Sequence, residues 1–354
     1  MMEFNGRKIW QQGSGDGDRK YFDICLNWDV ILNGPGNCGA YPDGAEILKK
    51  DGWSLKKITD IKRFAVDMQE EDLVVLRGGT NLVYGVGMIV GDYIWSDLFS
   101  DIDGWDLQHV RRVKWLWSYR NDNNHGPKEF NTYTLKQGDT TQPFDSQEVL
   151  TWIQSLNLDL TQVAIVKPLP TEQVNQVNNE EISDFLFSKG TSSSSIEHLR
   201  RTIDDLRTIA KWYKSESDPS EFETETHLIV PLLRALGWTP QKMALEWKNV
   251  DIALFRKLPR NNDELIAVFE AKRKGTSCLK AYSQAYDYAK PLKNCSRLIV
   301  SDGLRYGVFI KSDDPDSSFK LHAYMNLTDF RAEYPILECH GILEALWAMT
   351  PEWS

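Results

Sequence analysis

The chain has 354 residues, which is enough for two domains with separate cores, and its 41% hydrophobic and 26% charged residues are typical of a globular protein. Its formal net charge of -10 excludes a protein held on nucleic acid mainly by a basic surface, so DNA binding would depend on local patches and specific pockets. No apolar run approaches the roughly 20 residues of a membrane span and no signal-peptide core is present, which predicts a cytoplasmic protein without membrane contact.

Short alternating or apolar runs, bounded by Gly and Asp turns, predict a mainly β domain over residues 1–165. One helix-like segment, 58–71, lies among them. The glycine-rich alternation between Tyr84 and Tyr93 predicts a strand that bends around a small β-barrel. The predicted strands are 8–12, 29–34, 72–79, 82–95 and 109–117.

The order of these elements resembles that of the EVE and PUA-like domains that accompany restriction nucleases, over most of residues 7–118. The resemblance implies a domain that binds nucleic acid, and several members of that class hold a flipped modified base in an aromatic pocket. Reading a base in this way requires unstacking it, and stacking on protein rings compensates the cost. Each tryptophan is also suited to core packing. The pocket candidates are Trp10, Trp28, Tyr93 and Trp95, and the candidate contacts to the DNA backbone are Arg111, Arg112 and Lys114.

Residues 166–195 are rich in Pro, Asn, Glu and Ser, which predicts a linker with at most a short helix and with the serine run as its most flexible part. The next segment, 196–216, repeats apolar residues at three-four spacing. That spacing predicts an amphipathic helix, which packs on the following domain or forms a homodimer contact.

The second half, 196–354, contains two apolar runs that predict adjacent strands, 250–255 and 265–274. Successive side chains of a strand point to opposite faces, so Glu270 and Lys272 share one face. Burying them is costly unless they are paired or bind a ligand. Asp251, near the start of the other strand, joins them if the two strands pair. Two carboxylates suit Mg²⁺, with Mn²⁺ as a substitute, and the ammonium of Lys272 suits the orientation of water or the stabilisation of phosphate charge.

These residues resemble the PD-(D/E)xK nuclease superfamily, with Asp251 as the first acid and residues 270–272 as the ExK element. Upstream, 223–238 resembles the opening helix of the amino-terminal nuclease domain of type I restriction enzyme R subunits. The resemblance implies a helix acid at Glu223 that joins the metal ligands Asp251 and Glu270. His227 replaces the usual basic residue of this motif, which leaves open whether Glu223 or Glu225 is the helix acid.

Downstream, Gln284 and Tyr288 match the Gln-xxx-Tyr element that the family often carries, which implies a catalytic role for Gln284. Tyr282 and Tyr288 are expected to pack, and Asp302 is expected to be a turn residue. The run 296–309 resembles the closing strand pair of the family. The tail, 319–354, predicts a final strand and a short buried helix.

The expected architecture is therefore a two-domain α+β chain, with a PUA-like barrel and a restriction-endonuclease-like core with a mixed sheet. The expected function is a modification-dependent DNA endonuclease of the restriction or phage-defence kind, acting on double-stranded DNA. No GxxxxGK[ST] loop occurs, so no nucleotide is expected as a partner. The alternatives are a repair or recombination nuclease that reads DNA structure or RNA, and a non-enzymatic DNA-binding subunit with a nuclease fold as scaffold.

Overall fold

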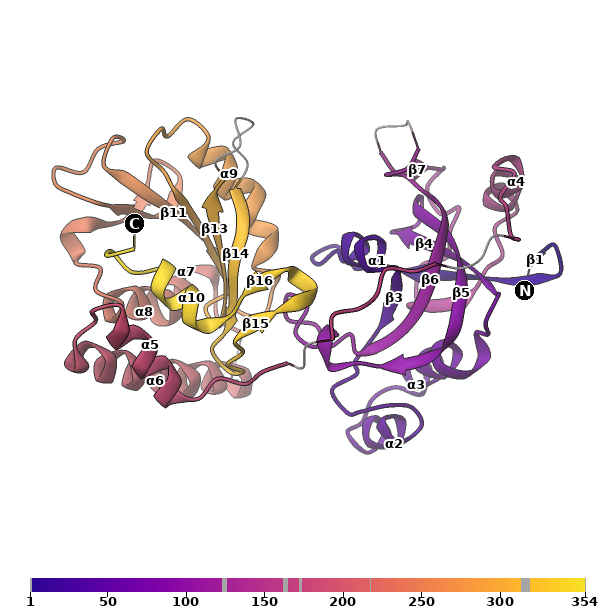
Figure 1. The fold of residues 1–354 in the computed structure, drawn as a ribbon, viewed down its shortest axis with the longest axis horizontal. Coiled ribbons are helices and arrows are strands. Elements are labelled where there is room, and N and C mark those ends of the chain that lie inside the picture. Colours follow the sequence, from indigo (N-terminus) through magenta and orange to yellow (C-terminus); the bar gives the residue numbers. More distant parts are fainter. Residues whose placement is uncertain are drawn as a thin grey trace. The chain divides into compact units, whose positions relative to one another are not determined.

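The protein is described from a computed structural model, which covers residues 2–122, 126–161, 165–171, 174–216, 218–312 and 319–353. The chain divides into two compact units, Met1–Thr171 (unit 1) and Glu172–Ser354 (unit 2). Each unit carries a mixed β-sheet with helices beside it (Figure 1). The α+β class predicted from the sequence is confirmed.

Unit 1 is built on a sheet in the order β1-β2-β4-β5-β6-β3, with β7 paired to β5 and β8 paired to β2. All five predicted strands are confirmed, whereas α1, α2 and α4 were not predicted. Register shifts interrupt the pairing of β5 with β6, and both are long, curved strands (Figure 1). The strands are β1 (Glu3–Phe4), β2 (Arg7–Gly13), β3 (Val30–Asn33), β4 (Leu73–Gly78), β5 (Leu82–Trp95), β6 (His109–Ser118), β7 (Lys128–Glu129) and β8 (Thr141–Pro143). The helices are α1 (Phe22–Trp28), α2 (Asp43–Lys50), α3 (Leu55–Lys62), the π-helix η1 (Arg63–Asp67), the 3-10 turn η2 (Asp97–Phe99) and α4 (Gln147–Ser155).

The predicted barrel is not closed by main-chain pairing in the described part of unit 1. Side chains bridge β3 to β2 and β8 instead. The Gln12 amide nitrogen donates to the Leu32 carbonyl (2.6 Å), the Asn33 amide donates to Thr141 Oγ1 (3.0 Å), and Thr141 Oγ1 donates to Gln12 Oε1 (2.7 Å). These buried polar groups satisfy one another where a strand ladder would otherwise run. The sheet is therefore curved but open.

Unit 2 contains a mixed sheet in the order β15-β16-β14-β13-β12-β11-β10-β9. The predicted pairing of residues 250–255 with 265–274 is confirmed as far as Ala271, since β10 and β11 are antiparallel neighbours with Ile252 opposite Phe269. The strand β11 ends at Ala271, so Lys272 lies just beyond it and not on the strand as predicted. β11 and β12 run parallel. The strands are β9 (Met243–Trp247), β10 (Val250–Phe255), β11 (Leu265–Ala271), β12 (Arg297–Ser301), β13 (Arg305–Lys311), β14 (Phe319–Asn326), β15 (Glu333–Tyr334) and β16 (Cys339–His340).

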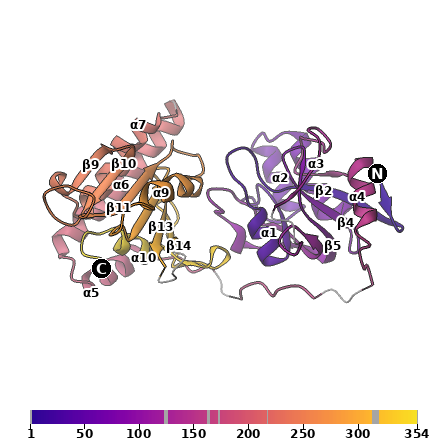
Figure 2. The ribbon, with the colours of Figure 1, turned by 90° about the horizontal axis from the view of Figure 1, so that it is seen from above.

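Helices cover both faces of this sheet (Figures 1 and 2). One face packs against a core that includes α5, α6, α8 and α10, and the other face packs against α9. The first and last of these helices, α5 and α10, lie side by side although they are far apart in the sequence. The helices are α5 (Asn179–Ser188), α6 (Ser193–Glu216), α7 (Glu221–Thr224), the π-helix η3 (Glu225–Ile229), α8 (Val230–Ala235), the 3-10 turns η4 (Pro240–Lys242), η5 (Leu279–Ala281) and η6 (Pro335–Leu337), α9 (Tyr282–Ala289) and α10 (Ile342–Ala348).

The segment expected as a linker, 166–195, largely belongs to unit 2. Ile182 and Leu186 of α5 are buried in the unit 2 core, and Asn178 with Glu181 forms a capping box at the start of that helix. The serine run does not form a flexible connection, because Ser193 begins α6 and the preceding Ser192 hydroxyl accepts a hydrogen bond from the Ser195 N–H. A polar composition here reflects capped, half-exposed helices. The structural boundary lies between residues 171 and 172.

No helix in the described ranges is long and apolar enough to cross a membrane. The five cysteines are free thiols, and all but Cys38 are buried.

Candidate active site

Three of the predicted site residues come from the paired strands β10 and β11. The register that places Ile252 opposite Phe269 brings Asp251 opposite Glu270, one step further along. The Ala271 N–H donates to Asp251 Oδ2 at 2.7 Å. This bond fixes the orientation of the Asp251 carboxylate and leaves its second oxygen free of that constraint.

Glu270 is fully buried, with 0% of its surface exposed. Neither of its carboxylate oxygens has a hydrogen-bond donor among the described residues. Burial and the neighbouring Asp251 carboxylate raise the pKa of Glu270 to about 8, against the opposing effects of Lys272 and of the Asp251 N–H, which lies near the carboxylate but outside hydrogen-bond geometry. A buried carboxylate without donors is costly in a folded protein, so this position calls for a proton or a cation.

Lys272 follows β11 and reaches toward α9. Its Nζ lies 3.4 Å from Gln284 Oε1, to which it donates, and 3.8 Å from the carboxylate of Glu221. Gln284 in turn donates to the Tyr288 hydroxyl at 3.4 Å. The structure thus brings Lys272 and Gln284 together, whereas Tyr288 acts on the lysine only through Gln284.

The two candidate helix acids lie in different surroundings. Glu223 closes a capping box, because its Oε2 accepts from both the N–H and the hydroxyl of Ser220 at 2.8 Å. These two bonds lower the pKa of Glu223. Glu225 is buried, and burial followed by the charge of Asp251 raises its pKa to about 7. The charge of Asp251 therefore acts on Glu225, whereas the carboxylate of Glu223 is held by Ser220, and this difference favours Glu225 as the helix acid.

Local backbone features hold this helix against the strands. Pro231 lacks an N–H and cannot donate the α-helical bond to the His227 carbonyl, and the preceding turn is the π-helix η3 that begins at Glu225. Gly303, in the turn after β12, has φ of +86°, and a Cβ there would lie 2.8 Å from Leu228 and 2.9 Å from the Thr224 methyl. The glycine permits this close approach, so the turn sets the depth at which Glu225 is buried.

The loop after β11 is fixed to the same turn. The Lys272 N–H donates to the Ser301 carbonyl (2.7 Å), and the Lys274 N–H donates to Thr224 Oγ1 (3.1 Å). Asp302 is a turn residue as predicted, since its Oδ1 accepts from the Leu304 and Arg305 N–H groups. The strand end, the helix and the turn are thereby joined by hydrogen bonds from main-chain N–H groups.

The chemistry of this carboxylate group suits a hard divalent cation. The described residues contain no three His, Cys, Asp or Glu side chains already arranged as a metal site. The charge of Asp251 raises the pKa of both Glu225 and Glu270, and Glu270 lacks a hydrogen-bond donor among the described residues. Carboxylate oxygens are the ligands that Mg²⁺ prefers. Asp251, Glu270 and Glu225 are the residues that would hold it.

Two of the predicted base-pocket residues are buried in unit 1. Trp10 is 1% exposed and its Nε1 donates to Asp72 Oδ2 at 2.8 Å. Trp28 is 6% exposed and lies under Lys167, whose Nζ is 3.7 Å from the ring centroid. A base cannot stack on a ring face that is already covered, so the structure gives both tryptophans a packing role.

The other two, Tyr93 and Trp95, share one face of β5 and are more accessible. The Tyr93 hydroxyl lies 2.6 Å from His109 Nδ1 and accepts from the Tyr41 N–H, and Trp95 Nε1 donates to the Gly36 carbonyl at 2.8 Å. Trp95 is 36% exposed. Trp10 and Trp28 are buried in the core, so they do not form a common pocket with Tyr93 and Trp95.

The predicted backbone contacts are mostly committed to the fold. Arg111 is 4% exposed, and its guanidinium donates to four carbonyls, those of Phe64, Ala65, Met68 and Gly91. Three of these carbonyls lie at or just after η1, where a helix end leaves acceptors unsatisfied. Arg111 is therefore unavailable to phosphate, contrary to the expectation.

Arg112 also serves the fold. It donates to the carbonyls of Trp28 and Asp29, each at 3.3 Å, and to that of Lys167. Lys114 is half-buried on the same face of β6. Arg112 is thus a weak candidate for a phosphate contact. For Lys114, only its position on β6 supports that role.

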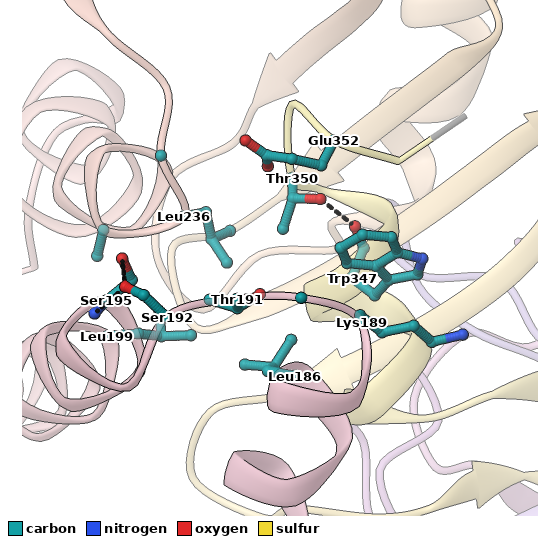
Figure 3. A pocket seen from close by; sticks show the side chains of 13 residues that line it. Leu186, Lys189, Thr191, Ser192, Ser195, Leu199, Leu236, Trp347, Thr350 and Glu352 are labelled. Atoms are coloured by element: carbon teal, nitrogen blue, oxygen red, sulfur yellow. Dashed lines mark hydrogen bonds between the residues drawn. The ribbon is translucent and has the colours of Figure 1, made fainter.

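A cavity of about 200 Å³ lies elsewhere in unit 2, between α5, α6, the end of α8 and α10 (Figure 3). Leu186, Leu199 and Leu236 form its apolar wall, and its hydroxyl groups bond locally, Ser192 with Ser195 and Thr350 with the Trp347 carbonyl. It contains none of the carboxylates described above. Its lining leucine side chains belong to the core opposite α9, so it is separate from the candidate active site.

Comparison with known proteins gives one family match. The model of a domain of unknown function (DUF8426) matches residues 15–138, which lie in unit 1. No curated protein and no solved structure matches the chain.

Proposed function

We propose that the protein is a modification-dependent DNA endonuclease of the restriction or phage-defence kind, with a PD-(D/E)xK-type active site in unit 2. The observation that carries this proposal is Glu270, a fully buried carboxylate that has no hydrogen-bond donor in the described part of the chain and lies opposite Asp251 by the register of the paired strands. A structural role would normally supply such a group with donors. A role in holding a cation accounts for the group as it stands.

The surrounding side chains have complementary tasks in phosphodiester hydrolysis. Asp251, Glu270 and Glu225 would hold Mg²⁺, which when bound supplies Lewis-acid stabilisation and a more acidic water. Lys272 stabilises negative charge that develops on the phosphate, because its ammonium lies at the open end of β11 with 22% of its side chain exposed. Gln284 positions this ammonium through its hydrogen bond.

The fixed backbone around these groups supports catalysis rather than simple binding. Asp251 is oriented by the Ala271 N–H, and the Lys272 main chain is held by the Ser301 carbonyl. Groups held in place before the substrate arrives need no reorganisation during the reaction. In this proposal unit 1 selects double-stranded DNA by a base modification, in line with the resemblance of its strand order to EVE and PUA-like domains.

The direct test is cleavage by the full chain of matched DNA that is unmodified, methylated, hydroxymethylated or glucosylated, with Mg²⁺ and with EDTA. We expect metal-dependent cleavage of at least one modified DNA in preference to its unmodified twin. Calorimetric titration of Mn²⁺ into the full chain gives a readout independent of activity, and Asp251→Asn should abolish the binding.

Two outcomes would overturn parts of this proposal separately. Absence of cleavage on every DNA with Mg²⁺ and Mn²⁺, together with absence of metal binding, would favour a non-enzymatic scaffold. Equal cleavage of modified and unmodified DNA would retain the nuclease and reject the targeting, which would favour a nuclease that reads DNA structure.

A further inference from the structure

Two histidines and a glutamate of unit 2, His322, His340 and Glu344, meet outside the candidate active site. They come from β14, β16 and α10, which pack against one another near the β15 edge of the sheet (Figure 1). His322 Nε2 lies 3.8 Å from Glu344 Oε2, and the two imidazole rings have centroids 5.0 Å apart. The chemistry proposed for the strands β10 and β11 uses none of the three.

A bulge directs His322 toward α10. The pairing of β14 with β13 shifts register at residues 308–309, and His322 is the extra residue of β14 at that point. Bulges re-aim side chains in this way. The next residue, Ala323, belongs to the core that includes α10, and His322 reaches Glu344 on the same helix.

The turn between β16 and α10 sets the main-chain positions of the other two residues. Gly341 permits the turn, because a Cβ there would lie 1.9 Å from the Arg331 carbonyl oxygen. The N–H groups of Gly341 and Ile342 donate to carbonyls of the loop before β15, at 2.8 and 2.9 Å. His340 and Glu344 stand on either side of this turn, so main-chain hydrogen bonds hold them near His322 before any ligand binds.

The electrostatics of this group favour a cation. His322 Nε2 has no hydrogen-bond partner among the described residues. Burial and the nearby His340 lower the pKa of His322, against the opposing effect of Glu344, so the ring is neutral at pH 7. Neutral imidazole is the form that binds a metal. The register also places the carboxylate-bearing Glu333 of β15 opposite His340, and residues directly opposite share a face of the sheet.

The distances are close to those of a zinc site. Zn–N and Zn–O bonds of about 2.0–2.2 Å put two ligand atoms of a tetrahedral zinc roughly 3.3 Å apart and two ligating imidazole centroids roughly 5 Å apart. The ion lies between its ligand atoms, so the gap between His322 and Glu344 admits it although Nε2 is closed to water. No three such side chains in the described ranges are in ligating geometry as they stand. Rotation of the exposed His340 side chain completes the set.

We propose that His322, His340 and Glu344 bind one Zn²⁺, with water in the fourth position. Two imidazoles and a carboxylate suit Zn²⁺, whereas Mg²⁺ prefers oxygen ligands alone. The side chains of His322 and Glu344 are 26% and 30% exposed, which leaves the ion a path from solvent. The ion joins α10 to β14 and β16, and the inference does not depend on the proposed nuclease function.

The test is a titration of Co²⁺ into the metal-free full chain, in a phosphine reductant that keeps the thiols reduced. Co²⁺ substitutes for Zn²⁺ and absorbs visible light more strongly in four-coordinate than in six-coordinate sites. We expect one Co²⁺ per chain with the absorption of a four-coordinate site, displaced by Zn²⁺ and not by excess Mg²⁺. Zn²⁺ should also raise the unfolding temperature, because it binds the folded chain.

His340→Ala should lower the Zn²⁺ affinity by about a hundred-fold or more, since loss of a ligand costs at least the 10–100-fold that loss of a ligand's outer partner costs. Glu344→Gln should act in the same direction. The matched control is His198→Ala, which removes an exposed histidine of α6. Asp251→Asn and Cys38→Ser should leave the Co²⁺ absorption unchanged, because neither residue belongs to this site.

Absence of four-coordinate absorption in the wild type, with no Zn²⁺ effect on the unfolding temperature, would overturn the site. Zn²⁺ binding that His340→Ala and Glu344→Gln leave unchanged would also overturn it, and thermal unfolding in EDTA shows that both variants are folded. Loss of the absorption in Asp251→Asn would assign the metal to the carboxylates of the candidate active site. That outcome rejects this inference and retains the proposed function, so the two fail separately.

Discussion

The two units bury ionisable groups in different ways. In unit 1 the buried Arg111 has carbonyl acceptors for all of its nitrogens, and His109 lies between the Tyr93 hydroxyl and the Pro35 carbonyl. In unit 2 the buried Glu270 has no donor within the described ranges, and the charge of Asp251 raises the pKa of the buried Glu225. The first arrangement is explained by the fold alone, whereas the second is incomplete without a proton or a cation.

This difference separates structural from functional candidates more sharply than residue type does. Arg111 and Arg77 are both buried arginines of unit 1, and only Arg77 keeps a donor without an acceptor. An unsatisfied donor alone does not mark a site, because the buried Arg297 of unit 2 also has an Nε–H without an acceptor among the described residues. The comparison can be tested by removing members of each class.

The largest effect is expected at the strand ends of unit 2. Asp251→Ala and Lys272→Ala should each lower the cleavage rate on the order of a thousand-fold or more, because metal binding or charge stabilisation is lost. Folding and DNA affinity should be retained. The matched control is Arg273→Ala, which removes the exposed neighbour of Lys272. Cleavage at the wild-type rate in either site variant would reject the site.

A smaller effect should distinguish the two helix acids. Glu225→Gln should reduce cleavage by about a hundred-fold, because the residue lies beside Asp251 and would contact the cation. Glu223→Gln should change the rate by no more than a few-fold and lower the stability slightly, through the weakened capping box. Single-turnover rates with both variants decide between the acids, and the reverse order of effects would restore Glu223.

Substitution of the satisfied arginine should affect stability and not recognition. Arg111→Met leaves four carbonyls without their donor and should lower the free energy of unfolding by about 2–4 kcal/mol. Arg112→Met, at a half-buried site with longer bonds, should cost less. Urea denaturation measures both. A loss of DNA affinity without a loss of stability would return Arg111 to the role of a phosphate contact.

The sequence predicted the strands well and the sites unevenly. Strong apolar alternation identified the strands of unit 1 and the β10–β11 pair, and the pairing alone brought Asp251 to Glu270. The helix acid could not be decided, because a π-turn begins at Glu225 and shifts the side-chain phase that a regular helix would give. The linker was overestimated because a capped helix, α5, is polar on its outer face.

The contacts of Arg111 and the cavity beside Arg77 could not be predicted from the sequence for a different reason. The acceptors of Arg111 come from η1, and the cavity of Arg77 is built by loops from distant parts of the chain, so no local pattern records either. Tryptophan density indicated aromatic function, yet Trp10 and Trp28 are core residues.

The last effect concerns pH, and it should have opposite signs in the two units. Burial lowers the pKa of His109 to about 4 from its usual 6.5. Between these two pH values folded unit 1 binds fewer protons than the unfolded chain. Unit 1 therefore loses about 3 kcal/mol of stability as the pH falls from 6.5 to about 4. Glu225 and Glu270 have pKa values raised to about 7 and about 8, so folded unit 2 binds more protons and loses stability as pH rises from about 4.5 to 8. Urea unfolding in EDTA across this range should show His109→Gln flattening the acid limb and Glu270→Gln flattening the alkaline limb. Mg²⁺ should restore the stability that the wild type loses at alkaline pH, because only ionised carboxylates bind the cation, and it should not stabilise Glu270→Gln. A Glu270→Gln variant that Mg²⁺ stabilises as much as the wild type would show that the cation binds elsewhere.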